Sequence, residues 1–145
     1  MAWAYFDTSA LIKRYVDEIG RREVLQLLRK NDCVVSAVLP IEVRSALRRR
    51  VSDGTLDEEQ IPTILKRVTA DRAFWTFVEV SSEALAAAET LAATHPLRAL
   101  DAIHVASAQL FATRLAPSAF IFVSADARQT TAAAARGMTT AHIPS

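Results

Sequence analysis

The sequence predicts an α/β fold in which helices cover both faces of a mostly parallel sheet. Two features lead to this prediction: short apolar runs typical of buried strands recur along the chain, and segments with apolar residues at helical spacing separate them. Because 51% of the 145 residues are hydrophobic, the chain suits one compact domain over residues 1–145. In chain order, the expected strands cover residues 2–6, 33–36, 78–80, 119–123 and 138–143.

Residues that favour helix ends mark the boundaries of the helices between these strands. Serine, threonine and aspartate side chains accept hydrogen bonds from first-turn amides, and proline is tolerated in a first turn. Glycine and proline favour the end of a helix, as at Gly54, Pro96 and Gly137. In chain order, the first expected helices follow Asp7, span 21–29 and begin near Pro40, and the next opens at a capping box within 56–61. The later helices are one capped by Ser81 and Ser82 that stops near His95, one around Asp101 and one over 127–136.

Four acidic residues occupy apolar surroundings in which an isolated charge would be costly. Asp7 directly follows the first strand, Asp126 closely follows the run 119–123, and Glu42 and Asp101 lie inside expected helices. Ligands of parallel sheets bind beyond the carboxyl ends of the strands, where Asp7 and Asp126 are expected. Carboxylates about 4 Å apart repel each other by roughly 4 kcal/mol per pair at an effective dielectric constant of 20. If the fold brings the four together, we expect an oxygen-rich pocket for Mg²⁺ or Mn²⁺.

These acids lie in four short sequence blocks. The blocks are Asp7-Thr8-Ser9-Ala10-Leu11, Glu42-Val43-x-x-Ala46-Leu47, Leu100-Asp101-Ala102-Ile103-His104-Val105-Ala106, and Ser124-Ala125-Asp126. In this order the blocks resemble the PIN-domain ribonucleases, most closely the VapC-type toxins of bacterial toxin–antitoxin systems, over nearly the whole chain. The resemblance implies a three-layer α/β/α fold of about five strands in the order 3-2-1-4-5, with the acids above the junction of strands one and four.

The resemblance also implies an activity, partners and a set of site residues. The activity is cleavage of RNA that depends on Mg²⁺ or Mn²⁺, carried out by a homodimer that a cognate antitoxin blocks. We expect Asp7 and Asp101 to bind the metal directly and Glu42 and Asp126 to act through water. Hydroxyl side chains stand where the family often has supporting groups: Thr8, Ser9 and Ser124.

Basic residues beside the expected site lead to an RNA-binding prediction. The formal net charge is only +1, so overall charge says little about partners. Arg44, Arg48 and Arg49 extend from the same expected helix as Glu42, and this basic stripe suits the phosphates of an RNA strand. A solvated helix face and an antitoxin contact are open alternatives for these arginines. Arg128 stands where some family members have a further acid, which leaves a second metal ion open.

The sequence gives no sign of export or of a membrane. A lone cysteine, Cys33, excludes an internal disulfide framework and a cysteine-rich zinc site, and it fits a reducing compartment. The apolar run at the start of the chain is too short for a signal-peptide core, and no stretch approaches the roughly 20 apolar residues of a membrane-spanning helix. We therefore expect a cytoplasmic protein.

Each candidate residue also has an ordinary structural interpretation. Taken alone, Asp7 and Asp126 fit helix caps, and Glu42 fits a solvated helix position. His104 follows Asp101 by one helical turn, and we interpret it as a supporting residue rather than a general base. Three neighbouring aromatic residues are interpreted as core or dimer-contact residues rather than base-stacking platforms: Phe74, Trp75 and Phe77.

Rival functions fit the four acids less well. The main alternative is a PIN-like module that binds RNA or protein without cleaving, and the presence of all four acids argues against it. A phosphotransferase of the haloacid-dehalogenase type usually needs a second aspartate two residues after the first, where this chain has Ser9. A phospho-receiver domain needs paired acids and a strand-end lysine, which the sequence does not provide.

Overall fold

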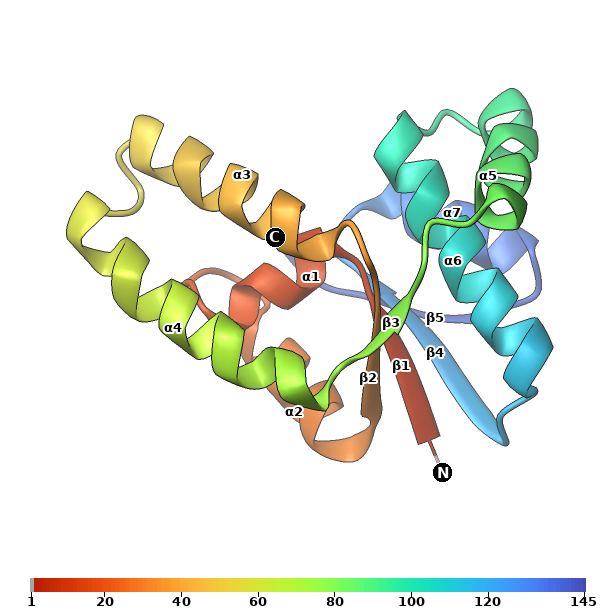
Figure 1. Cartoon of the computed structure of the whole chain (residues 1–145), viewed down its shortest axis with the longest axis horizontal. Coiled ribbons are helices and arrows are strands. Elements are labelled where there is room, and N and C mark those ends of the chain that lie inside the picture. The colour runs from red at the N-terminus through yellow and green to blue at the C-terminus, as the bar shows by residue number, and fades with distance from the viewer. Residues whose placement is uncertain (1) are drawn as a thin grey trace.

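The computed structural model describes residues 2–145 and confirms the predicted α/β architecture (Figure 1). Within these residues, five strands form one sheet in the order β3-β2-β1-β4-β5, which is the order that the family resemblance implied. Every strand pairing in this sheet is parallel. The strands are β1 (Ala2–Phe6), β2 (Asp32–Ser36), β3 (Thr76–Val78), β4 (Ala119–Ser124) and β5 (Thr139–His142).

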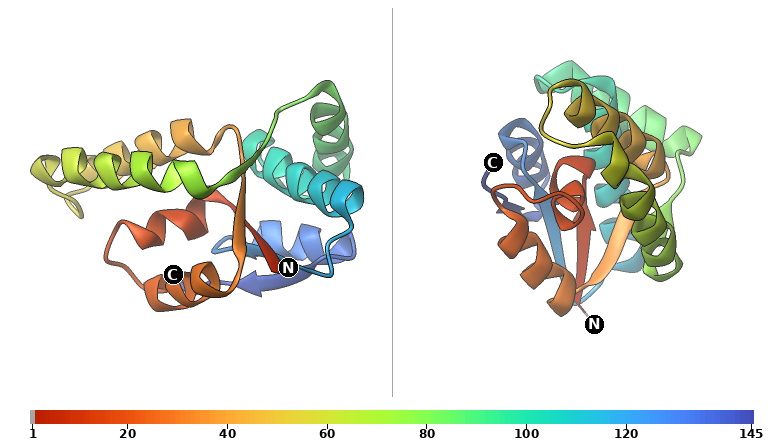
Figure 2. Two further views of the ribbon diagram at one scale, coloured as in Figure 1. Left: turned by 60° about the horizontal axis from the view of Figure 1, so that its bottom comes forward. Right: turned by 90° about the vertical axis from the view of Figure 1, so that its left-hand side faces the viewer.

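Helices lie on both sides of the sheet, so the three-layer arrangement is confirmed as well (Figure 2). In the described part of the chain these are α1 (Thr8–Leu11), α2 (Arg21–Lys30), α3 (Leu39–Ser52), α4 (Ile61–Asp71), α5 (Ser82–Thr94), α6 (Ala99–Leu115) and α7 (Ala127–Ala135). Single 3₁₀ turns cover Ile12–Arg14, Glu58–Gln60 and Arg72–Phe74. None of the helices in residues 2–145 has the length and apolar character needed to span a membrane.

The side chains of β1 alternate between two hydrophobic cores. Ala4 and Phe6 face the core that contains residues of α1, α2, α3 and α4, whereas Tyr5 faces the core that contains residues of α5, α6 and α7. All three side chains are fully buried. A central parallel strand is covered on both faces, which explains why its sequence is continuously apolar rather than alternating. The end of β1 is therefore held rigidly from both sides.

The third strand differs from its prediction because strand pairing, not local pattern, sets its limits. We expected residues 78–80, but β3 begins two residues earlier and pairs Val34 with Thr76 and Ser36 with Val78. The chain then leaves the sheet, and the hydroxyl of Ser81 accepts a hydrogen bond from the backbone N–H of Ala84 at 3.1 Å to cap α5. The predicted serine cap is thus confirmed, while the strand lies further from it than expected.

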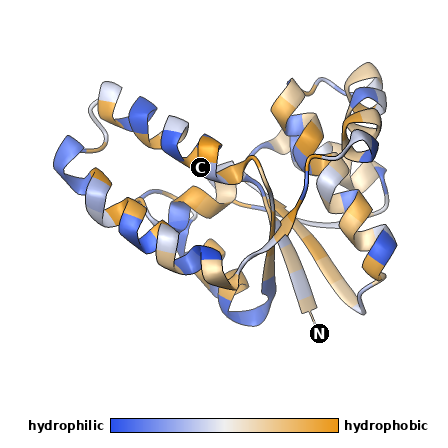
Figure 3. Ribbon diagram, viewed as in Figure 1, coloured by the Kyte–Doolittle hydropathy of each residue, from blue (hydrophilic) through white to orange (hydrophobic). Residues whose placement is uncertain are grey.

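Helices α3 and α4 form an arm that extends away from the sheet and returns (Figure 1). Its far end is mostly hydrophilic, in contrast to the hydrophobic strands (Figure 3). The predicted capping box is present, because Gln60 Oε1 accepts a hydrogen bond from the backbone N–H of Asp57 at 3.0 Å. It opens the 3₁₀ turn, and Pro62 then occupies the first turn of α4. The proline therefore starts the helix instead of interrupting it.

Candidate metal and active site

The four predicted acids lie at the amino-terminal ends of four helices. Asp7 caps α1 directly after β1, and Asp126 caps α7 shortly after β4. Glu42 and Asp101 lie in the first turns of α3 and α6. Because β1 and β4 are parallel neighbours, Asp7 and Asp126 leave the sheet at the same edge. The partial positive charge of a helix amino terminus favours a carboxylate at each of these positions.

All four acidic residues line one cavity of about 680 Å³. The same cavity is lined by polar and basic residues that include Thr8, Ser9, Arg49, Arg50, Arg98, His104 and Gln129. Ser124 does not line the cavity, but its hydroxyl donates a hydrogen bond to Asp7 Oδ2 at 2.8 Å. The fold therefore brings together side chains that are up to 119 positions apart in the sequence, from Asp7 to Asp126.

The arginines predicted to bind RNA occupy different environments. Arg49 lines the cavity, whereas Arg44 and Arg48 do not. Arg48 lies further along the arm, where its Nη1 is 2.6 Å from Glu58 Oε2 in an exposed ion pair. Arg98, the residue before α6, also lines the cavity, although it was not among the arginines predicted to bind RNA. Positive charge thus lies beside the acids on two sides, from α3 and from the start of α6.

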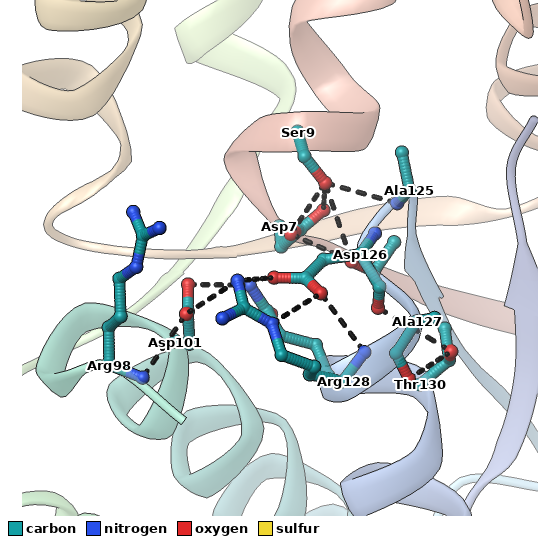
Figure 4. A network of polar contacts seen from close by, with 11 residues as sticks. Asp7, Ser9, Arg98, Asp101, Ala125, Asp126, Ala127, Arg128 and Thr130 are labelled. Atoms are coloured by element: carbon teal, nitrogen blue, oxygen red, sulfur yellow. Dashed lines mark hydrogen bonds and ion pairs between the residues drawn. The ribbon is translucent and has the colours of Figure 1, made fainter. Parts of the chain in front are cut away.

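Asp7 is a buried carboxylate, with 1% of its surface exposed. Its Oδ2 accepts hydrogen bonds from Ser9 Oγ at 2.7 Å and from Ser124 Oγ at 2.8 Å, and its Oδ1 accepts one from the backbone N–H of Ala10 at 3.0 Å (Figure 4). Burial raises the pKa of Asp7 above its usual value, although these hydrogen bonds act in the opposite direction. An anion in this position is one that a nearby cation would stabilise.

Glu42 is held by two side chains from other elements. Its Oε1 accepts a hydrogen bond from Thr8 Oγ1 at 2.7 Å and lies 2.5 Å from His104 Nε2. Burial raises the pKa of Glu42, but the contacts with His104 and Thr8 outweigh burial, and the net pKa lies below the usual value. His104 therefore contacts a site residue directly, in agreement with the supporting role expected for it.

Arg128 lies between two of the acids and supplies positive charge there (Figure 4). Its Nε and Nη2 donate to the two carboxylate oxygens of Asp126 at 3.2 and 3.1 Å, and Nη2 is 4.0 Å from Asp101 Oδ2. Burial raises the pKa of Asp126, but the hydrogen bonds and charge of Arg128 outweigh burial and lower it overall. In this structure a guanidinium group thus partly neutralises the side of the site where some family members have a further acid.

Gln129 is a site residue that the sequence reasoning missed. Its Nε2 donates to Asp101 Oδ1 at 3.0 Å, and its buried Oε1 has no hydrogen-bond partner among the described residues. A sequence signal did exist, because Gln129 is a long polar residue on the same face of α7 as the buried Ala132 and Ala133. Through this hydrogen bond Gln129 orients the carboxylate of Asp101 in the cavity.

The donor set fits a hard divalent cation in chemistry but does not form a closed ligand shell. Within residues 2–145, no three His, Cys, Asp or Glu side chains lie close enough together to form a metal-binding cluster. The four acidic side chains nevertheless line one cavity, and oxygen donors are those that Mg²⁺ and Mn²⁺ prefer. Mg²⁺ commonly uses only one or two protein carboxylates and keeps several waters, so a closed protein shell is not required.

Comparison with known families gives this cavity a context. The family model of the PIN domain matches residues 4–135, so the chain belongs to the PIN domain family. PIN domains are generally metal-dependent nucleases. No curated protein gives a significant match to the sequence.

Solved structures of similar fold come from bacteria and an archaeon. A structure described as a toxin–antitoxin complex from Klebsiella pneumoniae has 20% identity and a TM-score of 0.63, and the match covers 87% of this chain and 88% of that one. FitAcB from Neisseria gonorrhoeae has 13% identity and a TM-score of 0.66, covering 94% and 95%. PAE2754 from Pyrobaculum aerophilum has 16% identity and a TM-score of 0.64, covering 96% and 83%. At these identities the likeness shows the shared fold alone.

Proposed function

We propose that this protein is a metal-dependent endoribonuclease that acts as the VapC-type toxin of a toxin–antitoxin pair, with residues 1–145 forming one PIN domain. One observation carries the proposal: Asp7, Glu42, Asp101 and Asp126 line a single cavity at the edge of the sheet in a chain that belongs to the PIN family. Four carboxylates that line one cavity are costly for a folded protein unless positive charge accompanies them.

In this proposal the acids divide into direct ligands and residues that act through water. Asp7 and Asp101 bind a Mg²⁺ or Mn²⁺ ion directly, and Glu42 and Asp126 hold and orient water molecules. Such an ion, when bound, lowers the pKa of water and offsets the negative charge that develops on the scissile phosphate. The carboxylate of Asp101 is already oriented by the hydrogen bond from Gln129 Nε2.

The hydroxyl residues fix the acids in place. Ser9 and Ser124 donate to Asp7, and Thr8 donates to Glu42, so each of these acids has an oxygen held by side chains from the ends of β1 and β4. Such fixed orientation reduces the rearrangement needed when a cation or a substrate arrives.

RNA binding is assigned to the arginines beside the cavity. Arg49 is placed to contact a phosphate next to the reacting one, and Arg44 and Arg48 would extend the contact along the arm. Such contacts position the backbone and do not select a sequence. Selectivity would then come from the shape of an exposed single-stranded loop.

The proposed partners are a cognate antitoxin and a second copy of the chain. One structure of similar fold is described as a toxin–antitoxin complex, which supports an antitoxin partner. Phe74 is 84% exposed and Phe77 is 36% exposed, so aromatic surface is available for a homodimer contact, as the sequence suggested. A cytoplasmic location completes this proposal, since RNA and a newly made antitoxin are both present there.

The nuclease proposal can be tested with purified protein and a structured RNA in the presence of Mg²⁺ or Mn²⁺. We expect cleavage that stops with a chelator and falls roughly a hundredfold or more in Asp7→Asn and Asp101→Asn. Asp71→Asn is the matched control, because Asp71 binds Arg14 and Tyr15 outside the cavity, and it should retain cleavage. Cleavage that survives both site substitutions would show that the assigned residues are wrong.

One observation favours the alternative of a module that binds without cleaving. The guanidinium group of Arg128 already pairs with Asp126 and approaches Asp101, which reduces the need for a metal on that side. RNA that is bound but stays intact with either metal would support this alternative. A neighbouring reading frame for a small DNA-binding protein, co-purifying with this chain, would support the toxin assignment independently of the cleavage assay.

A further inference from the structure

Three side chains form a hydrogen-bonded series from the protein interior to the cavity. Tyr5 Oη lies 2.8 Å from His104 Nδ1, and His104 Nε2 lies 2.5 Å from Glu42 Oε1. Tyr5 is fully buried and His104 is 1% exposed, so water cannot replace these contacts, whereas Glu42 lines the cavity. The three residues belong to β1, α6 and α3, which are the elements that surround the site. The series therefore links the sheet to a proposed site residue.

The chemistry of these groups fixes the direction of each hydrogen bond. A carboxylate at neutral pH only accepts hydrogen bonds, so the 2.5 Å contact with Glu42 Oε1 requires His104 to donate from Nε2. In a neutral imidazole the other nitrogen is then an acceptor. The Tyr5 hydroxyl is therefore the donor to Nδ1, and burial raises the pKa of Tyr5, which keeps this proton on the phenol oxygen. The opposite tautomer would place the Nε2 lone pair against the carboxylate.

The same contacts determine which oxygen of Glu42 is available. Oε1 accepts from both Thr8 Oγ1 and His104 Nε2. Rotation of the carboxylate away from His104 would leave the buried N–H only the 3.5 Å contact with Thr8 Oγ1, which is a weaker interaction. Among the described residues, no hydrogen bond reaches Glu42 Oε2. This second oxygen is the one left to act in the cavity.

We propose that Tyr5 and His104 are positioning residues: Tyr5 holds His104 as the Nε2–H tautomer, and His104 holds Glu42 so that Oε2 is presented to the cation or its water. This inference rests on the proposed nuclease function and deepens it. Residues that orient a site carboxylate from behind typically affect metal affinity or activity roughly 10- to 100-fold when they are changed. Neither residue contacts the reacting atoms, so neither is called catalytic.

The tautomer can be measured on the metal-free wild-type protein, which makes this test independent of cleavage. Long-range ¹H–¹⁵N NMR spectra of the imidazole should show a protonated Nε2 and an unprotonated Nδ1 for His104 at about pH 8. In Tyr5→Phe, which keeps the buried ring but lacks the hydroxyl donor, we expect a mixture of tautomers. A neutral Nδ1–H form or a doubly protonated ring in the wild-type protein would overturn the assignment.

Variants separate positioning from a purely structural role. Tyr15→Phe is the matched control for Tyr5→Phe, because Tyr15 is also buried and its hydroxyl donates to a carboxylate, Asp71 Oδ2, at 2.5 Å outside the cavity. We expect Tyr5→Phe to weaken Mn²⁺ binding and to lower kcat with little change in KM. Both the Mn²⁺ affinity and kcat are corrected for the fraction of folded protein. Tyr15→Phe should change only stability. If the two variants changed Mn²⁺ affinity and kcat equally, Tyr5 would have only a packing role.

Two substitutions of His104 distinguish its donor from its volume. His104→Gln retains an N–H donor near the position of Nε2, whereas His104→Leu fills similar space without a donor. We expect roughly a 10- to 100-fold loss of Mn²⁺ affinity or turnover in His104→Leu and partial recovery in His104→Gln. Equal losses in both would contradict the proposed role. If even the wild-type protein cleaves no RNA, the proposed function fails, while the tautomer and Mn²⁺ measurements still decide this inference.

Discussion

Replacing Asp7 with asparagine should stabilise the protein in the absence of metal even though it removes a proposed metal ligand. Asp7 is 1% exposed, and burial raises its pKa. Asparagine has the same shape, can accept from the backbone N–H of Ala10, and can donate to the hydroxyls of Ser9 and Ser124. We therefore expect a gain at neutral pH on the order of 1 kcal/mol, which is the usual size of a single-substitution effect. For a domain of this size, that is roughly 3 °C in Tm.

The pH dependence of the gain identifies its cause. A carboxyl group whose pKa is higher in the folded chain contributes stability that is fully present below the unfolded pKa, about 3.9, and is lost as the pH rises through the folded pKa. Asparagine does not titrate. The advantage of Asp7→Asn over the wild type should therefore be small near pH 4 and grow toward neutral pH. Thermal unfolding followed by circular dichroism in the presence of a chelator measures this difference.

A second acid provides a control of opposite sign. Burial raises the pKa of Asp71, but hydrogen bonds from Arg14 and Tyr15 outweigh burial and lower it overall. Asp71→Asn should therefore be less stable than the wild type at neutral pH, with the loss shrinking as the pH falls through the folded pKa. Adding Mn²⁺ should raise the Tm of the wild type and leave that of Asp7→Asn unchanged. The reasoning is refuted if Asp7→Asn unfolds at a lower temperature than the wild type at neutral pH without metal.

Three further substitutions test other parts of the structure. Arg128→Ala should tighten Mn²⁺ binding by up to about fivefold, because the exposed guanidinium group pairs with Asp126 and competes with the metal. Calorimetry should show no gain in Mn²⁺ affinity for Arg136→Ala, at the other end of the same helix. An equal gain in affinity for Arg136→Ala would indicate only a long-range charge effect. Arg49→Ala should weaken RNA binding and reduce the slope of log affinity against log salt by about 0.7. Arg48→Ala, which removes a side chain already paired outside the cavity, should weaken RNA binding less than Arg49→Ala does. A larger loss of RNA affinity in Arg48→Ala would indicate that the RNA lies along the arm. Gly20→Ala should lower the free energy of unfolding, measured in urea, by roughly 1–3 kcal/mol. The reason is that φ of Gly20 is +92° and a Cβ would lie 2.3 Å from a backbone oxygen of the C-terminal segment. Unchanged stability would contradict this close packing.

Local sequence patterns predicted the elements whose limits are set locally. The apolar run before Asp7 and the serine before α5 define a strand end and a helix start by their own chemistry, and both predictions are confirmed. The limits of β3 depend on its pairing with β2, so the segment 78–80 looked as good a strand as the one that forms. The strand order followed from the family resemblance and not from any local pattern.

For the site, the sequence indicated which acids to consider but not what surrounds them. Asp7 and Asp126 stood out because each follows a strand, and the structure places both at one cavity. The contacts of Arg128 and Gln129 could not be predicted, because they depend on the direction of side chains across separate helices. The buried partnership of His104 with Tyr5 has the same origin, since the two residues are 99 positions apart. The catalytic and metal-binding roles of all these residues remain predictions.

The distribution of the four acids along the chain has a consequence for biosynthesis. Asp126 is contributed by the segment that follows β4, and β4 lies between β1 and β5 in the finished sheet. A ribosome that has made only the first hundred or so residues holds a chain with no partner for that side of β1 and without the last carboxylate. For the nuclease proposed above, the acidic site would therefore be complete only after β4 and the segment that follows it have joined the sheet beside β1.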